Sequence, residues 1–496
     1  MLLTTQLVDD GLAIVSVSRD LVHASSLRKL TEACENLNQR GRRGILIDMA
    51  RVRRMNMSGL AAVVELVARH PKWDIGLCAL PAKIARMVSQ SGLDRGLPIF
   101  PDVETACKAP EFRGRSLCGT RAVLLCADRG RRAAPLTDVT PTPMLDVVGR
   151  PILHRIMDHL AGFGLRDVIL NPGHHGDQVV EYVRAHAWPD HRIQFANEGS
   201  FHQGQWRGDP IGTASTLKRL QVTSSAFSSD LVVLCGDALV DIDMAEMMRQ
   251  HRQSGAAVTI AVQSVAPEQG HGYGVIETSV GGRITGFAEK PRLGLAENQL
   301  VNTGIYIMKP EVLDLVSDSI GLDIATDLLP AVMAARLNMQ VFSQPFQWID
   351  IGCSQDYARA TALCLSGELP FVRPLGLEIR PNVWALPGAE VAADARIDGP
   401  CHIGANAVIS AKAHLSGGCV IGAGAEVEGK TLLKDCIVLP ETRVCEGAWS
   451  DHKILSGAWA MDRNQAFNPV LDNSIGDHVT PRQDMRQPAP ELRKSA

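Results

Sequence analysis

The sequence lacks several features that would point to particular classes of protein. None of its twelve cysteines forms a Cys-x-x-Cys pair, which argues against a zinc site and against a disulfide framework. No apolar run approaches the length of a membrane span, and the N-terminus has no basic-then-apolar signal. The formal net charge is only −4, so no basic excess favours nucleic acid as a partner. The sequence therefore predicts a soluble cytoplasmic protein with reduced thiols.

The length of the chain indicates several domains. A chain of 496 residues is too long for one typical core and predicts two to four domains. We expect an alternating β/α domain over residues 1–110, a polar linker over 109–120 and an α/β domain over 119–366. A repeat follows over 374–450, and a polar, aliphatic-poor stretch predicts a disordered tail over 460–496.

The N-terminal region alternates between short β-branched runs and amphipathic patterns of helical period. The runs predict strands over residues 12–17, 44–49, 75–80 and 97–100. The amphipathic patterns predict helices over residues 25–37, 59–69, 82–90 and 103–107. No catalytic set is visible in this region, which favours a regulatory or docking role.

The central region opens with a strand, a loop and a helix. The apolar run at residues 122–126 predicts a buried strand, Gly130 lies in the basic loop that follows, and residues 152–162 form an amphipathic helix. This arrangement aims backbone N–H groups at a bound phosphate. A second strand over 167–170 and a helix over 177–185 continue the alternation. The pattern predicts a mainly parallel sheet with a site at the carboxyl ends of its strands.

One strand of this region ends in a candidate metal ligand. The apolar run that starts at Leu231 leads directly to Asp237. Aspartate at a strand end is a poor core residue and a good ligand for a hard cation. A turn-forming role is the alternative that the sequence leaves open.

A six-residue period marks the C-terminal region. Aliphatic residues recur at Val391, Ile397, Ile403, Ile409, Leu415, Ile421, Val427 and Leu433. A small residue stands two positions before each of them, at Ala389, Ala395, Cys401, Ala407, Ala413, Cys419, Ala425 and Thr431. Two coupled periods predict a left-handed parallel β-helix, with aliphatic residues inside and small residues at the corners.

The β-helix raises the question of acyl transfer, because such coils also build acyltransferases. We expect His402 and His414 to face outward, and the pattern accounts for fewer than three complete coils. A structural or assembly role is therefore favoured over an acyl-transfer site.

The loop after the first central strand resembles the opening loop of nucleotide-diphosphate-sugar pyrophosphorylases, the sugar-1-phosphate nucleotidyltransferases. The residues that carry the resemblance are Gly130, Arg132, Pro135, Leu136, Thr137, Pro141, Pro143 and Met144. The resemblance implies that Ala127, Asp128, Gly130 and Arg131 belong to the nucleotide-binding loop. It also implies that Gly212 and Thr213 form a turn that packs against the base.

The same loop departs from the family's form. Ala127 and Asp128 replace two glycines, Arg131 replaces a threonine, and Thr142 replaces a lysine. Loss of one charge-assisted phosphate contact costs about 2–4 kcal/mol, by analogy with loss of one oxyanion donor. These departures have two interpretations. In the first, the arginines of the loop offset the lost contact; in the second, the loop no longer holds a triphosphate.

Later motifs extend the resemblance. Asp237 and the aspartate of Trp348-Ile-Asp350-Ile-Gly352 match the family's Mg²⁺ ligands. The motifs around Tyr273 and Gly274, around Glu289 and Lys290, and at Asn302 match those that contact the sugar and its phosphate. The implied catalytic residues are Arg132, Lys290 and Asp237.

The resemblance implies a reaction in which an oxygen of a sugar 1-phosphate attacks the α-phosphate of a nucleoside triphosphate and pyrophosphate leaves. Such phosphoryl transfer depends on alignment and charge neutralisation. Domain order resembles mannose-1-phosphate guanylyltransferases and glucose-1-phosphate adenylyl- or thymidylyltransferases. The motif ending at Tyr306 and the motif around Asp350 favour GTP and mannose 1-phosphate, for polysaccharide synthesis by a homo-oligomer.

Residues 45–60 resemble the STAS domain, whose strand ends in a turn of the form Asp-Ser-Ser-Gly-Leu. Ser58, Gly59 and Leu60 match its last three positions, whereas Asn56 and Met57 replace the first two. Ser58 has two interpretations, a helix N-cap and a phosphorylation site at a helix start. A STAS-like domain also implies a protein partner.

Three hypotheses follow. The first is an NDP-sugar pyrophosphorylase with a STAS-like regulator. The second is a catalytically weak protein that binds nucleotide or NDP-sugar and signals through the STAS-like domain. The third is a β-helix acyltransferase. Asp128 and Thr142 distinguish the first two, because both are expected in a degraded site and unexplained in an efficient one.

Overall fold

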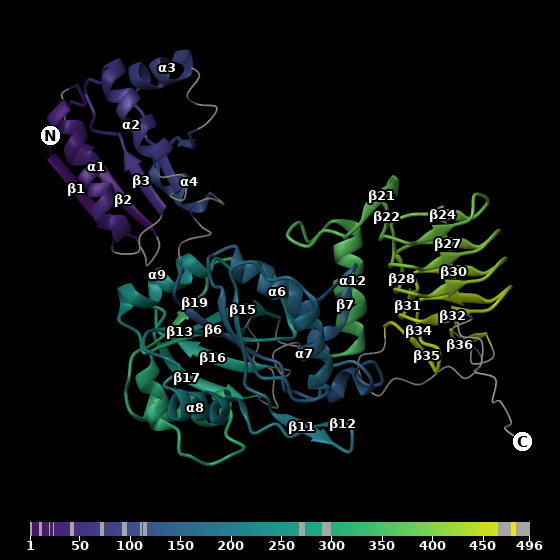
Figure 1. The fold of residues 1–496 in the computed structure, drawn as a ribbon. Helices are drawn as coiled ribbons and strands as arrows, with labels where there is room; N and C mark the ends of the chain where they lie inside the picture. Colours follow the sequence, from purple (N-terminus) through teal and green to yellow (C-terminus); the bar gives the residue numbers. More distant parts are fainter. Residues whose placement is uncertain are drawn as a thin grey trace, which may run out of the picture.

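The chain folds into three units, seen in Figure 1 as a purple N-terminal domain, a teal central domain and a green-to-yellow stack of strands. This computed structural model describes residues 2–8, 12–18, 20–22, 24–39, 44–69, 74–91, 97–109, 112, 117–266, 273–289, 299–464 and 478–482. The structural statements below concern these residues.

The N-terminal domain is a five-stranded sheet in the order β1-β2-β3-β4-β5. The strands are β1 (Leu2–Leu7), β2 (Leu12–Ser18), β3 (Gly44–Asp48), β4 (Asp74–Cys78) and β5 (Ile99–Phe100). The helices are α1 (Ala24–Gln39), α2 (Met57–Arg69), α3 (Ala82–Ser91) and α4 (Val103–Lys108). The expected elements are confirmed, with the addition of β1, which pairs antiparallel with β2. Strand β1 is a largely exposed edge strand, and its leucines do not alternate with polar residues, so it lacks the usual strand pattern.

The expected linker is anchored at two points. Phe112 is fully buried and its ring contacts that of Phe100 at 5.6 Å in a T-shaped arrangement. The N–H of Leu117 donates to the carbonyl of Phe163 at 2.8 Å, at the start of the central domain. The linker therefore attaches to both domains through apolar residues.

The central sheet runs in the order β10-β9-β6-β13-β18-β15-β19. Its strands are β6 (Arg121–Leu125), β9 (Asp167–Leu170), β10 (Arg192–Phe195), β13 (Leu231–Cys235), β15 (Val258–Val265), β18 (Gln299–Met308) and β19 (Met339–Phe342). Only β18 is antiparallel to its neighbours along this path. The mainly parallel sheet is confirmed.

Helices cover both faces of the central sheet, so alternate strand residues are buried in different cores. Leu124 packs with α6, α7, α9 and α12, whereas Leu125 packs with α8 and α11. These helices are α6 (Ile152–Ala161), α7 (Gly176–Ala185), α8 (Thr213–Ser224), α9 (Met244–Ser254), α11 (Leu329–Ala334) and α12 (Ser354–Ser366). Short pairs complete the domain: β7 (Asp146–Val147) with β8 (Arg150–Pro151), β11 (Gly199–His202) with β12 (Gln205–Gly208), β14 (Ala238–Val240) with β20 (Trp348–Asp350), and β16 (Gly274–Thr278) with β17 (Ile284–Glu289).

The C-terminal strands stack in three sheets, as predicted for a parallel β-helix (Figure 1). One sheet holds β21 (Leu377–Arg380), β22 (Val383–Ala385), β25 (Cys401–Ile403), β28 (Cys419–Ile421), β31 (Ile437–Val438), β34 (Lys453–Leu455) and β35 (Ala460–Asp462). The second holds β23 (Glu390–Val391), β26 (Val408–Ile409), β29 (Glu426–Val427), β32 (Thr442–Val444) and β36 (Val479–Pro481). The third holds β24 (Arg396–Asp398), β27 (His414–Ser416), β30 (Leu432–Lys434) and β33 (Trp449–Asp451). The hand of the coil stays a prediction.

The expectation of fewer than three coils was wrong. Successive strands β22, β25, β28, β31 and β34 pair in parallel, which is four steps along the stack. The partner of Cys401 is Cys419, eighteen residues on, but the partner of Val420 is Ile437, seventeen residues on. Because one residue is missing from each later coil, a strict six-residue count stops at Leu433.

His402 lies on the outer face of its sheet, as expected, but it is not exposed to solvent. Its side chain is 1% exposed, and Nε2 lies 3.0 Å from the carbonyl oxygen of Leu375. The outer face of its sheet packs against the central domain, since Val420 and Ile437 share a core with Leu365 of α12. His414, on another face, is partly exposed and contacts Asp398 at 2.8 Å.

The expected disordered tail contains two strands. Strand β35 turns back on β34, and β36 adds to the edge of β32, both antiparallel. Val479 and Met461 are buried, so a few apolar residues anchor a polar segment. The remainder of the tail, residues 465–477 and 483–496, lies outside the described residues.

Candidate functional site

Two adjoining compartments open at the carboxyl ends of the central strands. The outer compartment, of about 530 Å³, is lined by Asp128, Arg129, Gly130, Arg131, Arg132, Thr142, Gly208, Asp209, Pro210, Asp237, Ile351 and Gly352. The inner compartment, of about 200 Å³, is lined by Leu125, Arg132, Thr213, Cys235, Asp237, Tyr273, Gly274, Asn302, Thr303, Gly304, Tyr306, Asp323, Ile324, Ala325, Trp348 and Asp350. Arg132 and Asp237 line both, so they stand at the junction.

The loop after β6 forms one wall of the outer compartment. Gly130 has φ 59°, in the left-handed region, and a Cβ there would lie 2.5 Å from Oγ1 of Thr142. The carbonyl of Gly130 accepts from the hydroxyl of Thr137 at 2.9 Å. Glycine is therefore required at this position both by the backbone angle and by the close approach of Thr142.

Three positions at which the chain departs from the resembled family have distinct surroundings. Ala127 is buried, and a Cβ on Gly173 would lie 2.7 Å from it. Asp128 is exposed, and its Oδ1 accepts from the N–H of Arg129 at 2.8 Å. Thr142 is buried beside Gly130 and carries no charge. The cations that line the outer compartment are therefore arginines.

Two carboxylates meet at the inner compartment. Asp237 follows β13, and its carbonyl accepts from the N–H of Ile351 at 2.9 Å. Asp350 ends β20, where it is the register partner of Ala238. The pairing of β14 with β20 thus brings together two aspartates that lie far apart in the sequence.

Burial and neighbouring charges shift the protonation of both carboxylates. Burial and the charge of Asp128 raise the pKa of Asp237 to about 6, against the opposing effect of Arg132. Burial and the charge of Asp237 raise the pKa of Asp350 to about 8, while Arg132 and a hydrogen bond from Tyr273 oppose the rise. Burial is the largest cause of both shifts, so the site disfavours two charged carboxylates unless a further cation enters it.

Arg132 lies against both carboxylate-bearing segments. A Cβ on Gly352 would lie 2.9 Å from Nη2 of Arg132 and 3.1 Å from Oδ2 of Asp350. A side chain at position 352 would therefore displace the guanidinium or the carboxylate. The glycine allows the cation to reach the junction of the compartments.

The residues present fit a divalent cation. Mg²⁺ prefers oxygen ligands and is commonly held by one or two carboxylates together with substrate phosphates. Asp237 and Asp350 supply two carboxylates whose mutual repulsion a cation would relieve.

The inner compartment has an aromatic wall. The rings of Tyr273 and Trp348 lie 5.3 Å apart in a T-shaped arrangement. Asn302 donates to the hydroxyl of Tyr306 at 2.7 Å and accepts from the N–H of Gly304 at 3.0 Å. The Asn302 amide therefore holds the shape of β18 as well as lining the compartment.

The turn before α8 is fixed by a second loop. Gly212 has φ 95°, and a Cβ there would lie 2.4 Å from the carbonyl oxygen of Leu322. The hydroxyl of Thr213 donates to Asp323 at 2.7 Å and accepts from the N–H of Ile324 at 2.8 Å. Asp323, which this contact brings into the inner compartment, carried no sequence signal.

Two predicted sugar-phosphate residues are only partly placed. The backbone of Glu289 ends β17 opposite Gly274, which lines the inner compartment. Lys290 lies outside the described residues.

Other residues in and beside the two compartments were not predicted from the sequence. Tyr306 and Trp348 lay within quoted motifs but received no role, and Asp209 and Pro210 carried no motif. Glu198 contacts both walls of the outer compartment, but no sequence pattern around it identifies it as a residue of the site. Its position becomes visible only through its hydrogen-bond partners.

In the N-terminal domain, Ser58 is not the cap of α2. The N–H of Gly59 donates to Oδ1 of Asn56 at 2.9 Å, which makes Asn56 the capping residue. Ser58 is the second residue of the helix and is exposed. The N-cap interpretation of Ser58 is therefore wrong.

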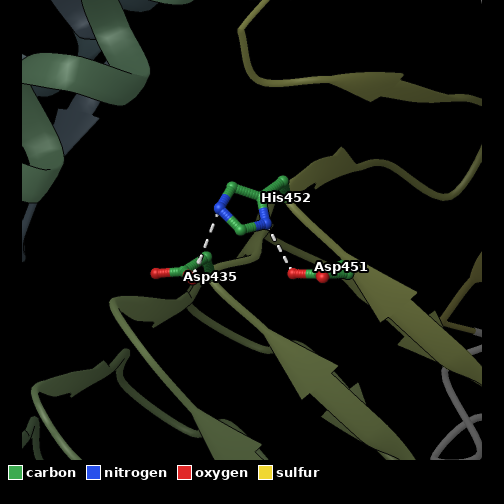
Figure 2. A group of neighbouring side chains, drawn as sticks. All are labelled: Asp435, Asp451 and His452. Atoms are coloured by element: carbon green, nitrogen blue, oxygen red, sulfur yellow. Dashed lines mark hydrogen bonds and ion pairs between the residues drawn. The ribbon is translucent and has the colours of Figure 1, made fainter.

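A different cluster on the β-helix also has metal-ligand chemistry (Figure 2). Asp435, Asp451 and His452 are the only such trio in the described part of the chain. Nδ1 of His452 lies 2.5 Å from Asp451 and Nε2 lies 3.5 Å from Asp435. Asp435 also accepts from the N–H of Gly418 at 2.9 Å, and Lys434 lies 3.3 Å from Asp451. These contacts close turns between coils.

Among the helices of the described residues, none is long and apolar enough to cross a membrane.

Comparison with known proteins matches two regions. A family model described as "Nucleotidyl transferase" matches residues 121–367, and one described as "Mlab, STAS domain" matches residues 10–101. A "UTP--glucose-1-phosphate uridylyltransferase" of Synechocystis sp. is 31% identical over 377 residues, 75% of this chain and 96% of that protein. A "Mannose-1-phosphate guanylyltransferase catalytic subunit beta" of Drosophila pseudoobscura pseudoobscura is 34% identical over 321 residues, 64% of this chain and 80% of that protein. A "Mannose-1-phosphate guanyltransferase" of Schizosaccharomyces pombe is 29% identical over 350 residues, 69% of this chain and 89% of that protein. The chain therefore belongs to the nucleotidyl transferase family and carries an N-terminal STAS domain.

Proposed function

We propose that this protein makes an NDP-sugar and pyrophosphate from a nucleoside triphosphate and a sugar 1-phosphate. The observation that carries the proposal is the junction at which Arg132, Asp237 and Asp350 meet between two compartments. The larger compartment, with its three arginines, suits a triphosphate, and the smaller, with its aromatic wall and Asn302, suits a sugar.

The reaction requires the two phosphates to meet in line at this junction. An oxygen of the sugar 1-phosphate attacks the α-phosphorus, a new P–O bond forms, and the bond to the β-phosphate breaks as pyrophosphate leaves. Arg132 lies where it can neutralise charge on the reacting phosphates, and Gly130 allows the loop backbone to approach the triphosphate. Lys290 is proposed to hold the attacking phosphate, and Glu289 a sugar hydroxyl.

We propose Mg²⁺ as the divalent ion, held by Asp237 and Asp350. When bound, the ion supplies charge neutralisation at the reacting phosphates. The two aspartates orient and confine it, while Tyr273, through its hydrogen bond to Asp350, keeps that carboxylate directed at the site.

GTP and mannose 1-phosphate are the proposed substrate pair, supported by the motifs around Tyr306 and Asp350 and by the mannose-1-phosphate relatives. The longer match to a UTP–glucose-1-phosphate uridylyltransferase favours UTP and glucose 1-phosphate as the second candidate pair.

The test is pyrophosphate release by the purified protein with Mg²⁺. The common nucleoside triphosphates are combined with mannose, glucose and other sugar 1-phosphates. Turnover with one pair is expected and would identify the substrates. If no pair turns over while nucleotide or NDP-sugar still raises the melting temperature, the protein is a sensor rather than an enzyme.

The STAS domain is proposed to regulate this activity through a protein partner. Ser58 is exposed in the first turn of α2, where a phosphate would be favoured by the helix dipole. Phosphopeptide mass spectrometry of protein isolated from its own cells tests this, with Ser58→Ala as the control.

Free thiols at all twelve cysteines support a reducing, cytoplasmic location, and a homo-oligomer is proposed from the β-helix.

A further inference from the structure

Glu198 lies between the two walls of the outer compartment. It follows β10 and precedes the β11–β12 hairpin, and it is only 2% exposed. A buried carboxylate is costly unless hydrogen bonds or counter-charges compensate it. Its partners therefore show what its burial stabilises.

One oxygen of Glu198 is connected to the loop wall. Oε1 accepts from Nδ2 of Asn171 at 3.2 Å. Oδ1 of the same Asn171 accepts from the N–H of Cys126 at 2.6 Å, at the point where β6 gives way to the phosphate-facing loop. Asn171 thus connects Glu198 to the first residue of that loop.

The opposite wall is connected through both oxygens and through the backbone carbonyl of Glu198. Oε2 accepts from the N–H of Ile211 at 3.0 Å, one residue before Gly212. The Glu198 carbonyl accepts from the N–H of Asp209 at 2.7 Å, and the hydroxyl of Thr216, in the first turn of α8, donates to Oε1.

The loop after β6 and the turn before α8 are far apart in the sequence, separated by α6, α7, β9, β10 and the β11–β12 hairpin. Arg219, whose guanidinium lies 4.0 Å from Oε1 with its side chain 41% exposed, supplies a counter-charge from the solvent side. Both oxygens of the Glu198 carboxylate therefore help to hold the loop at Cys126 and the turn at Ile211 at a fixed separation.

We infer that Glu198 is a positioning residue for the nucleotide: it sets the distance between the phosphate-facing loop and residues 208–211, of which Gly208, Asp209 and Pro210 line the outer compartment. This inference rests on the proposed function. Glu198 does not line either compartment, so it acts through Asn171 and Ile211.

Glu198→Gln is the sharpest variant. Glutamine retains one oxygen for Asn171 and Thr216 but places an NH₂ group opposite the N–H of Ile211, where two donors face each other. The KM for the nucleoside triphosphate is expected to rise about tenfold, while the KM for the sugar 1-phosphate changes less than about twofold. A loss of general stability would not separate the two constants in this way.

Thr259→Val is the matched control. Thr259 is 1% exposed and bonds to Nδ1 of His251 at 2.8 Å, within the same domain but away from both compartments. The Thr259→Val substitution removes a buried hydrogen bond, so it is expected to lower the melting temperature and leave both KM values unchanged. If Glu198→Gln does not fold, Thr216→Val removes one donor while keeping the carboxylate, and a smaller rise in the same KM is expected.

Nucleotide affinity is also measured by calorimetry with Mg²⁺ and without sugar. A folded Glu198→Gln variant that binds the triphosphate as tightly as the wild type overturns the inference. Equal increases in both KM values overturn it as well. Absence of turnover in the wild type would instead overturn the proposed function, and weaker nucleotide binding by the variant would still support the role of Glu198.

Discussion

Asp237 and Asp350 are two carboxylates that line the inner compartment. Burial raises the pKa of both, the charge of Asp237 adds to the rise at Asp350, and Arg132 opposes the rise in each. A cation held between them would remove the repulsion. The chemistry at this scale therefore depends on two ligands and one guanidinium.

Asp237→Asn is expected to lower the rate of pyrophosphate release at least 100-fold, because an amide is a weaker ligand and cannot neutralise a cation. This corresponds to about 3 kcal/mol. The rate is measured at limiting and saturating Mg²⁺. Asp318→Asn, which changes an exposed aspartate, is the control and should have no effect. Full activity of Asp237→Asn at limiting Mg²⁺ would contradict the metal assignment.

Arg132→Ala is expected to lower kcat about 10²- to 10³-fold, by analogy with removal of one transition-state donor. The side chain lies at the junction of the compartments and against Gly352. Arg132→Lys keeps the charge but loses the planar fork, so it should lose less. Steady-state kinetics with both substrates separates the effects; equal activity of the alanine variant and the wild type would remove Arg132 from the catalytic set.

At the scale of elements, ends of strands and helices position the functional groups. A metal-ligand candidate follows β13 and another ends β20, and the start of α8 is fixed by Asp323. The start of α2 is fixed by Asn56, not by Ser58. This leaves the Ser58 hydroxyl free of the capping role.

Asn56→Ala is expected to destabilise the start of α2 by about 1 kcal/mol, because the N–H of Gly59 loses its acceptor. Asn56→Asp should retain the cap, and Ser58→Ala should change stability by less than about 0.5 kcal/mol. Hydrogen exchange of the α2 amides in the full-length protein measures the difference. Faster exchange in Ser58→Ala than in Asn56→Ala would show that the serine caps the helix.

At the scale of the whole molecule, the β-helix is joined to the central domain by a buried contact. His402 lies against Gly149 and the Leu375 carbonyl, where a Cβ on Gly149 would be 3.0 Å from its Nε2. Burial, reinforced by the charge of Arg155, lowers the pKa of His402 to about 4. The contact therefore requires a neutral imidazole.

The stability of this contact should depend on pH. The unfolded chain, with an ordinary histidine pKa near 6.5, binds a proton more readily than the folded protein, so stability is full above pH 6.5 and falls as pH drops towards 4. The contribution of His402 to this fall is of the order of 3 kcal/mol. Denaturation of the wild type and of His402→Leu between pH 4 and 7 measures it. The variant should have the shallower slope, and equal slopes would assign the pH dependence to other groups.

The sequence by itself determined the three units, most of their strands and helices, and the positions of the chemical groups. These chemical groups lie at a strand end, in a turn or in a short motif, and each such pattern can be recognised from neighbouring residues. The residues are Gly130, Arg132, Asp237 and Asp350. The six-residue period likewise records the inward and outward alternation of each coil.

Only the tertiary structure decided which of these groups meet and which are buried. Asp237 and Asp350 meet because β14 pairs with β20, and His402 is buried because one face of the β-helix packs on α12. Glu198 acquires its role from Asn171 and Ile211, which precede and follow it at some distance in the chain. Such contacts depend on how helices and strands pack against one another. The periodicity of a sequence shows only which face of its own helix or strand a residue lies on.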